Sequence, residues 1–182
     1  MQEFVRTALS RYLTTQHVPS PEEVGIPADH PLMRRKDIVF VTIYRNGEVI
    51  ASSGRVAVKK SSSAVELVEN ALLCLKDPRI AEFLGDPTLL DAVRIRVDII
   101  PTEKRKIIST LSEIDPNVHG LILISEQHEA LGVVLPGMSR LASTPEELFF
   151  LVAKKAGLDS QSLSEEEYIL YTIETEVSAD PE

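Results

Sequence analysis

The spacing of apolar residues predicts three amphipathic helices. Apolar side chains recur three and four positions apart in residues 2–15, 63–75 and 144–155. In the second segment, Ser63 and Glu66 have the spacing of a capping box. Pro78 ends this helix, because a proline disfavours helical backbone at the residue before it.

The third helix has the clearest end signals. Thr144, Pro145 and Glu147 suit the cap, the first position and the third position of a helix. Gly157 suits the position just after its last turn. Residues 104–114 are predicted to form a further short helix.

Period-two patterns and turn residues predict the strands. Ile38–Tyr44 is rich in β-branched residues and leads into Asn46-Gly47, a pair typical of tight hairpin turns because both residues adopt positive φ. The second strand begins near Glu48. Small residues at 52–54 interrupt it, which is typical of a bulge or of a close backbone approach, and it resumes at 56–58.

The later strands complete the fold class. They are predicted at residues 93–100, 119–125, 130–135 and 168–177. In the first of these, Arg94, Arg96 and Asp98 alternate with apolar residues, so one face is expected to be wet, as in an antiparallel sheet. Hairpins outnumber strand–helix–strand units, which predicts an α+β fold with an antiparallel or mixed sheet and flanking helices.

The chain length fits a single domain. We expect residues 1–182 to form one domain, or one domain with two lobes that share a core. Residues 17–31 contain several prolines and little periodicity, which predicts an extended arm lying against the body. The acidic tail at 178–182 is predicted to be disordered.

Charge and composition exclude several classes of function. The chain has 19 Lys and Arg against 28 Asp and Glu, a net charge of −9. This charge repels phosphate backbones and anionic lipid, so we expect neither nucleic acid nor a membrane as a partner. The single cysteine suits a reducing compartment, and the N-terminal residues carry charge where a signal peptide needs an apolar run. The expected location is the cytoplasm.

Motifs for nucleotides, metals and activated serines are absent from the sequence. It contains no Walker loop, no Rossmann glycine pattern and no nucleophile elbow. His119 and His128 could face each other across a hairpin, with Glu126 or Glu129 nearby. We interpret both histidines as ordinary hairpin-end residues and expect no metal and no cofactor.

Three polar features remain as candidates. Asp77 and Arg79 flank the end of the second helix, where they could tie down loop backbone or face a ligand. Cys74 lies near the apolar helix face and is interpreted as a small core residue. The small-residue break at 52–54 could bind an anion or a carbonyl, or only relieve sheet twist.

Taken in order, these segments resemble the AMMECR family over about residues 4–177. The matching features after the opening helix are the segment VFVTIYRNGEV at 39–49, Asp77-Pro78-Arg79, the strand at 94–100 with Pro101, Gly120-Leu121-Ile122, Leu135-Pro136 and Lys155-Ala156-Gly157-Leu158. The resemblance implies an α+β fold of two unequal lobes with a groove between them. Some microbial members accompany Memo-like and radical-SAM proteins, so such partners are implied only by analogy.

One departure from the family pattern bears on function. Family members carry Arg-Gly-Cys-Ile-Gly after the hairpin strand, and this chain has Ile-Ala-Ser-Ser-Gly at 50–54. The change removes a guanidinium with its paired donors and places Ser52 where the family has cysteine. An unassisted serine hydroxyl is a poor nucleophile, so the resemblance implies that the thiol chemistry is lost.

The leading hypothesis is a non-catalytic domain that binds a small molecule or a protein, or has a regulatory role. Its candidate groove is lined by Ser52, Ser53, Gly54, Asp77, Arg79, Pro136 and Gly137. The alternative is an enzyme in which Ser52 or Ser53 replaces the family cysteine, helped by Asp77 or a histidine. A third hypothesis is a structural subunit that pairs through an exposed sheet edge. The sequence leaves the ligand and the oligomeric state open.

Overall fold

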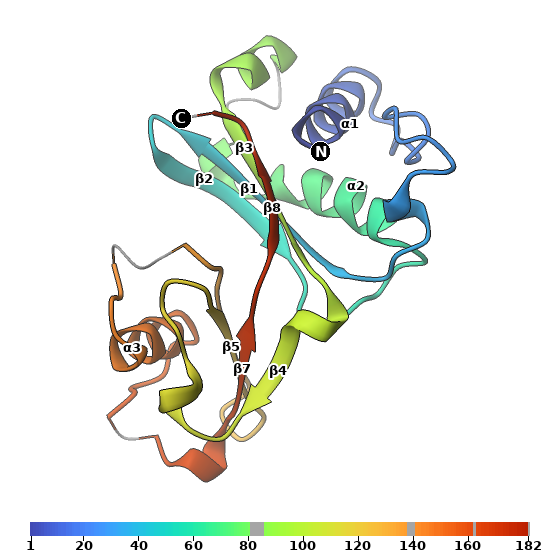
Figure 1. The fold of residues 1–182 in the computed structure, drawn as a ribbon. Coiled ribbons are helices and arrows are strands. Elements are labelled where there is room, and N and C mark those ends of the chain that lie inside the picture. Colours follow the sequence, from blue (N-terminus) through green and yellow to red (C-terminus); the bar gives the residue numbers. More distant parts are fainter. Residues whose placement is uncertain (81–85, 138–140, 162, 182) are drawn as a thin grey trace. The chain divides into compact units, whose positions relative to one another are not determined.

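A computed structural model describes residues 1–80, 86–137, 141–161 and 163–181, and the chain forms two compact units (Figure 1). Unit 1 comprises Met1–Ile99 and Glu176–Glu182, and unit 2 comprises Ile100–Thr175. Each unit contains one antiparallel four-stranded sheet and its own cluster of buried apolar residues. The chain is therefore α+β, as the pattern predicted.

Unit 1 places two helices over one sheet. Its elements are α1 (Gln2–Thr15), β1 (Ile38–Arg45), β2 (Glu48–Gly54), α2 (Ser63–Cys74), β3 (Arg94–Ile100) and β8 (Glu176–Ala179). The strands follow the order β2-β1-β3-β8, which we call sheet A. Helix α2 packs on β1 and β2, and α1 packs on α2 (Figure 1).

The proline-rich arm lies against unit 1, as expected. Val24 and Ile26 are almost fully buried in the unit 1 core, together with Leu32 of the short 3-10 helix Pro31–Met33. Pro19 is buried as well. The arm thus forms part of the surface beside α1 and α2.

The predicted hairpin forms, with its irregularity at a different place. Asn46 and Gly47 make the turn with φ of 52° and 81°. Strand pairing shifts between Ile43, opposite Ala51, and Tyr44, opposite Val49, so the extra residue is in the 49–51 segment. The predicted bulge at 52–54 is wrong, because these residues pair regularly with β1. The strand predicted at 56–58 is also wrong, since β2 ends at Gly54.

The start of α2 differs by one residue from the prediction. Ser62, not Ser63, is the N-cap, and its hydroxyl accepts from the Val65 N–H at 3.4 Å. Glu66 does not complete a capping box, because its Oε1 accepts from the backbone N–H groups of Lys59 and Lys60 at 2.7 and 2.9 Å. This carboxylate therefore fixes the loop before the helix.

Unit 2 places one helix over the second sheet. Its elements are β4 (Arg105–Ile108), β5 (Gly120–Ser125), β6 (Ala130–Val134), α3 (Pro145–Lys155) and β7 (Ile169–Ile173). The strands follow the order β4-β7-β5-β6, and α3 packs on β5 and β6. The helix predicted at 104–114 is wrong. Residues Arg105–Ile108 form β4, which pairs with β7, and a 3-10 turn follows at Leu111–Glu113.

The signals around α3 are confirmed. The hydroxyl of Thr144 accepts from the Glu147 N–H at 3.2 Å, and the Glu147 carboxylate accepts from the Thr144 N–H at 3.2 Å. Pro145 opens the helix, and Gly157 follows it with φ of 77°. Local sequence therefore determines both ends of α3.

Residues Glu176–Ala179 form a strand, and Asp180 is held by hydrogen bonds, so the predicted disorder is wrong for residues 178–180. The strand predicted at 168–177 is divided into β7 in unit 2 and β8 in unit 1. Strand β8 pairs with β3. Asp180 then accepts from the guanidinium of Arg6 and from the Ile95 N–H, each at 2.8 Å. These bonds join both ends of the chain to sheet A.

Candidate functional site

The two serines of strand β2 point to opposite faces of sheet A. Ser52 is exposed and pairs with Thr42 on β1, with 3.1 Å between their hydroxyl oxygens. Ser53 points toward α2, where its hydroxyl donates to the Asn70 side-chain oxygen at 3.2 Å. Successive side chains of a strand alternate between faces. The two serines therefore cannot line the same face of a site.

Neither serine hydroxyl has the partner that would activate it. A serine nucleophile needs an adjacent general base such as an imidazole. In the described ranges, Ser52 meets a second hydroxyl and Ser53 meets a carboxamide. Gly54 has a packing role, because a Cβ there would lie 2.1 Å from the ring of Phe40. This geometry contains no serine–base pair.

Helix α2 makes two side-chain hydrogen bonds to the carbonyls of β1. Asn70 is fully buried and donates its amide to the Val39 carbonyl at 3.0 Å. The Cys74 thiol donates to the Val41 carbonyl at 3.6 Å. Burial, and then the negative charge of Asp77, raise the pKa of Cys74 to about 12. The thiol is thus protonated at neutral pH, which agrees with its predicted role as a core residue.

Asp77 and Arg79 clamp the end of α2 to the edge of β2. Two guanidinium nitrogens of Arg79 donate to the Asp77 carboxylate at 2.6 and 2.9 Å, and the Arg79 backbone N–H donates to it at 3.0 Å. A third guanidinium nitrogen donates to the Val49 carbonyl at 2.9 Å. The side-chain bonds from Arg79 lower the pKa of Asp77 to about 2. The pair lies at the edge of the strand that contains Ser52, with its hydrogen-bonding groups engaged by loop and strand.

The last two predicted groove residues belong to unit 2. Pro136 and Gly137 follow β6, and Gly137 has φ of 93°. Pro136 packs on the start of β5, since a Cβ on Gly120 would lie 2.8 Å from its ring. The grouping of these residues with Ser52, Ser53, Gly54, Asp77 and Arg79 stays a prediction.

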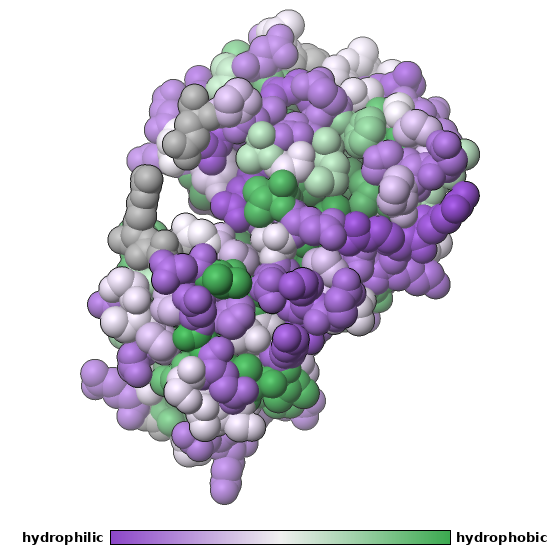
Figure 2. Space-filling view, in the orientation of Figure 1, coloured by the Kyte–Doolittle hydropathy of each residue, from purple (hydrophilic) through white to green (hydrophobic). Residues whose placement is uncertain are grey.

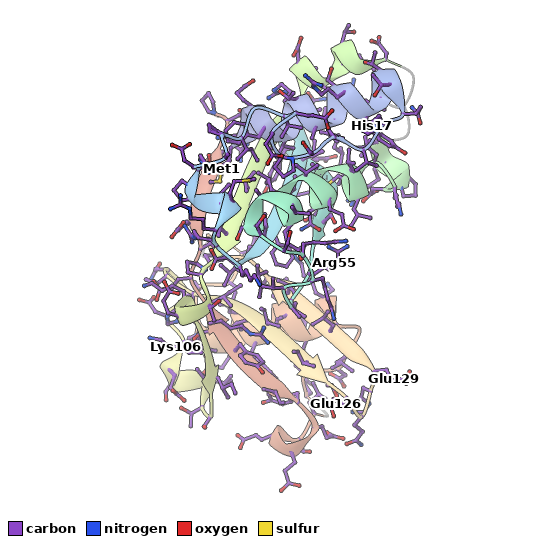
Figure 3. All side chains as sticks on the ribbon, turned by 90° about the vertical axis from the view of Figure 1, so that its right-hand side faces the viewer. Met1, His17, Arg55, Lys106, Glu126 and Glu129 are labelled. Atoms are coloured by element: carbon purple, nitrogen blue, oxygen red, sulfur yellow. The ribbon has the colours of Figure 1, made fainter. Side chains whose placement is uncertain are left out.

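His119 and His128, which could have faced each other across a hairpin, lie at opposite ends of β5. His119 precedes β5 and His128 follows it, so the six-residue strand separates them by about 20 Å at roughly 3.4 Å per residue. His119 accepts from the Asp115 N–H at 3.0 Å, and His128 lies 3.4 Å from the Glu167 carboxylate. Figure 3 shows Glu126 and Glu129 at this hairpin end. Within the described residues, no histidine, cysteine and carboxylate side chains are grouped as metal ligands would be.

Unit 1 contains a concave, mostly apolar surface along α2, which we call the α2 groove. It has a volume of about 500 Å³. Its lining residues are Tyr12, Val18, Pro19, Pro21, Lys60, Val65, Val68, Glu69, Leu72, Leu73, Leu75 and Lys76. They come from α1, the arm, and α2 with the residues at its two ends. Figure 2 shows apolar surface among hydrophilic residues over the region of α1 and α2.

The groove exists because α2 is apolar on two sides. Ala64, Leu67 and Ala71 are buried in the core cluster that packs on sheet A. Val65 and Leu72 belong to a second stripe, only partly buried, that lines the groove. A surface helix with one partner needs one apolar stripe. The sequence signal for the groove is the breadth of this apolar face, which includes Val65 and Leu72 as well as the residues that pack on sheet A.

Charged side chains also line the groove. At the middle of α2, Glu69 accepts from Lys60 at 2.9 Å and from Arg55 at 3.1 Å. Arg55 also bonds the buried Glu66 at 3.0 Å, and it lies on the segment between β2 and α2 (Figure 3). Beyond the end of α2, Lys76 is exposed on the groove. The groove thus has an apolar floor and a polar rim.

Comparisons with known proteins agree on one family and one fold. The AMMECR1 family model matches residues 2–178. Among solved structures, the uncharacterized protein PH0010 from Pyrococcus horikoshii superposes with a TM-score of 0.79 at 20% identity, covering 97% of this chain and 88% of that one. No curated protein sequence matches. None of the described helices is both long enough and apolar enough to cross a bilayer.

Proposed function

The chain belongs to the AMMECR1 family. We propose that it is a non-catalytic binding domain whose α2 groove holds a small molecule with an apolar body. The observation that carries the proposal is the groove itself. Binding sites for small molecules are concave, mostly apolar and roughly 300–1,000 Å³ in volume. The α2 groove, at about 500 Å³, falls in this range.

The groove is formed in unit 1 alone, from elements that are fixed by the core. Helix α2 is tied to β1 through Asn70 and Cys74, and the arm is anchored by Val24 and Ile26. Such a preformed site loses little conformational entropy when a ligand binds. An apolar ligand would also cover Leu72 and Val65, which are only partly buried in the free protein.

The surroundings of the serines support binding over catalysis. Ser53 is engaged by Asn70, and Ser52 is paired only with the hydroxyl of Thr42. With Cys74 buried and its pKa at about 12, the described part of the chain shows no activated nucleophile beside β2. The cytoplasm remains the proposed location, because a single buried thiol suits a reducing compartment.

A neutral fluorescent probe tests the proposal. N-phenyl-1-naphthylamine brightens in apolar sites, and the chain has no tryptophan to complicate its signal. We expect saturable binding to the wild-type protein and at least five-fold weaker binding to Val18→Glu, which places a charge at the groove without touching the core. The matched control is Val118→Glu, which changes an exposed valine of unit 2.

Two results would overturn the proposal. One is a probe affinity that Val18→Glu and Val118→Glu change equally, because the apolar site would then lie elsewhere. The other is turnover of any groove-bound compound that Ser52→Ala abolishes. That second result would instead support the enzymatic alternative.

A further inference from the structure

The charge of the α2 groove differs in sign from that of the whole protein. Among the groove residues, two lysines stand against one glutamate, whereas the chain has a net charge of −9. The glutamate, Glu69, is engaged by Lys60 and also by Arg55. The groove is therefore a local positive region on an acidic surface, which favours an anionic ligand.

Only one end of the groove has a cation without a carboxylate partner. Lys60 is paired with Glu69 at 2.9 Å. Throughout the described residues, Lys76 forms no ion pair, and the neighbouring carboxylate of Asp77 is held by Arg79. The exposed ammonium group of Lys76 is thus the charge that a ligand in the groove can neutralise.

The end of α2 does not oppose an anion at this position. A helix C-terminus carries partial negative charge on its last free carbonyl groups. Here the carbonyls of Leu72, Leu73 and Cys74 accept from the N–H groups of Leu75, Lys76 and Asp77 at 3.0–3.1 Å. These capping bonds reduce the unfavourable field, and they also hold the backbone of Lys76 in place.

We propose that the ligand of the α2 groove is an amphipathic monocarboxylate, with its hydrocarbon body along α2 and its carboxylate at Lys76. This inference rests on the proposed function. Val65, Glu69 and Leu72 form one stripe of α2, and Lys76 follows just after the end of the helix. At 1.5 Å per residue, the distance from Val65 to Lys76 along the helix axis is about 16 Å. An extended medium-chain acid fits that length, and its single charge meets the single available cation.

Three probes with the same chain test the charge preference. Decanoate, decanol and decylamine are titrated against bound N-phenyl-1-naphthylamine in low salt. For the wild-type protein we expect decanoate to displace the dye best and decylamine worst. We expect Lys76→Gln to weaken decanoate about two- to five-fold, as for an exposed ion pair, and to leave decanol unchanged. Lys76→Glu should reverse the order of decanoate and decylamine.

The control and the possible outcomes separate this inference from the proposed function. Lys154→Gln removes an exposed lysine of unit 2 and should change none of the three affinities. Equal displacement by decanoate and decanol in the wild type would overturn the carboxylate assignment and leave the groove proposal intact. A decanoate preference that survives Lys76→Gln would overturn the role of Lys76. Failure of the dye and all three probes to bind would overturn both proposals.

Discussion

The buried amide of Asn70 is expected to be a major contributor to the stability of unit 1. The side chain is fully buried, donates to the Val39 carbonyl at 3.0 Å and accepts from the Ser53 hydroxyl at 3.2 Å. Asn70→Ala removes both bonds and leaves two polar groups without this partner. Each such buried group costs about 1–3 kcal/mol, less for Ser53 because it is only half-buried. We therefore expect a loss of about 2–4 kcal/mol in the free energy of unfolding.

Two companion variants make this prediction specific. Ser53→Ala removes only one of the bonds and should cost about 1 kcal/mol. The double variant should cost less than the sum of the two single variants, because both remove the same Ser53–Asn70 bond. Urea unfolding followed by circular dichroism measures all four proteins under identical conditions.

Asn70→Asp tests in which direction the stability of the variant depends on pH. At neutral pH its carboxylate would be buried beside the Val39 carbonyl, so burial should raise its pKa above the unfolded value of about 3.9. A protonated acid can donate to Val39 as the amide does. The loss of stability relative to wild type should therefore be smallest below about pH 4 and grow as the pH rises. A loss below 1 kcal/mol in Asn70→Ala, or a pH-independent Asn70→Asp, would refute the reasoning.

The contacts of Cys74, Asp77 and Gly132 give further predictions. Cys74 is buried, and its pKa is about 12. Ellman's reagent should therefore not react with the folded protein at pH 8, and it should react fully in 6 M urea. Immediate reaction with the folded protein would contradict this prediction. Because folding raises the pKa of the Cys74 thiol above its ordinary value of 9.0, the contribution of this thiol to stability should fall as the pH rises above about 9. The pKa of Asp77, about 2, means that the clamp to Arg79 stabilises above about pH 4 and is lost toward pH 2. Above about pH 4, Asp77→Asn should lower the free energy of unfolding by about 0.2–1 kcal/mol, because the pair is partly exposed. This difference from wild type should disappear between about pH 4 and pH 2. A difference that stays constant over this pH range would argue against the clamp. Gly132→Ala should lower the free energy of unfolding in urea by about 1–3 kcal/mol or more, because the added Cβ would lie 2.3 Å from the Val152 carbonyl of α3. An unchanged unfolding midpoint would show that α3 can shift.

Elements with local end signals were predictable from the sequence. The Asn46-Gly47 turn, the capping box of Thr144 and Glu147, and the stripe of α1 each depend on residues within one turn or one hairpin. The α+β class followed from the same local patterns. These features need no knowledge of distant partners.

Elements decided by distant partners were mispredicted. Residues 105–108 are a strand because β7 pairs with them, and residues 176–179 are a strand because β3 does. Asp98 was expected on a wet face, yet it is fully buried, with its carboxylate held by Arg96 at 2.7 and 2.8 Å. Alternation of polar and apolar residues shows that the two faces of a strand differ. It cannot show what covers either face.

The candidate site likewise has features that the sequence indicates and features that only the folded structure determines. The sequence by itself indicated that Cys74 is a core residue, which its burial confirms, whereas the placement of Ser52 at the family cysteine position stays a prediction. Only the tertiary structure decided that Ser52 and Ser53 face apart, that Arg79 reaches the edge of β2, and that a second apolar stripe of α2 is left open beside the arm. The physical reason is that a sequence encodes each element's own periodicity and turns, whereas a groove is formed by side chains from segments that meet only after folding.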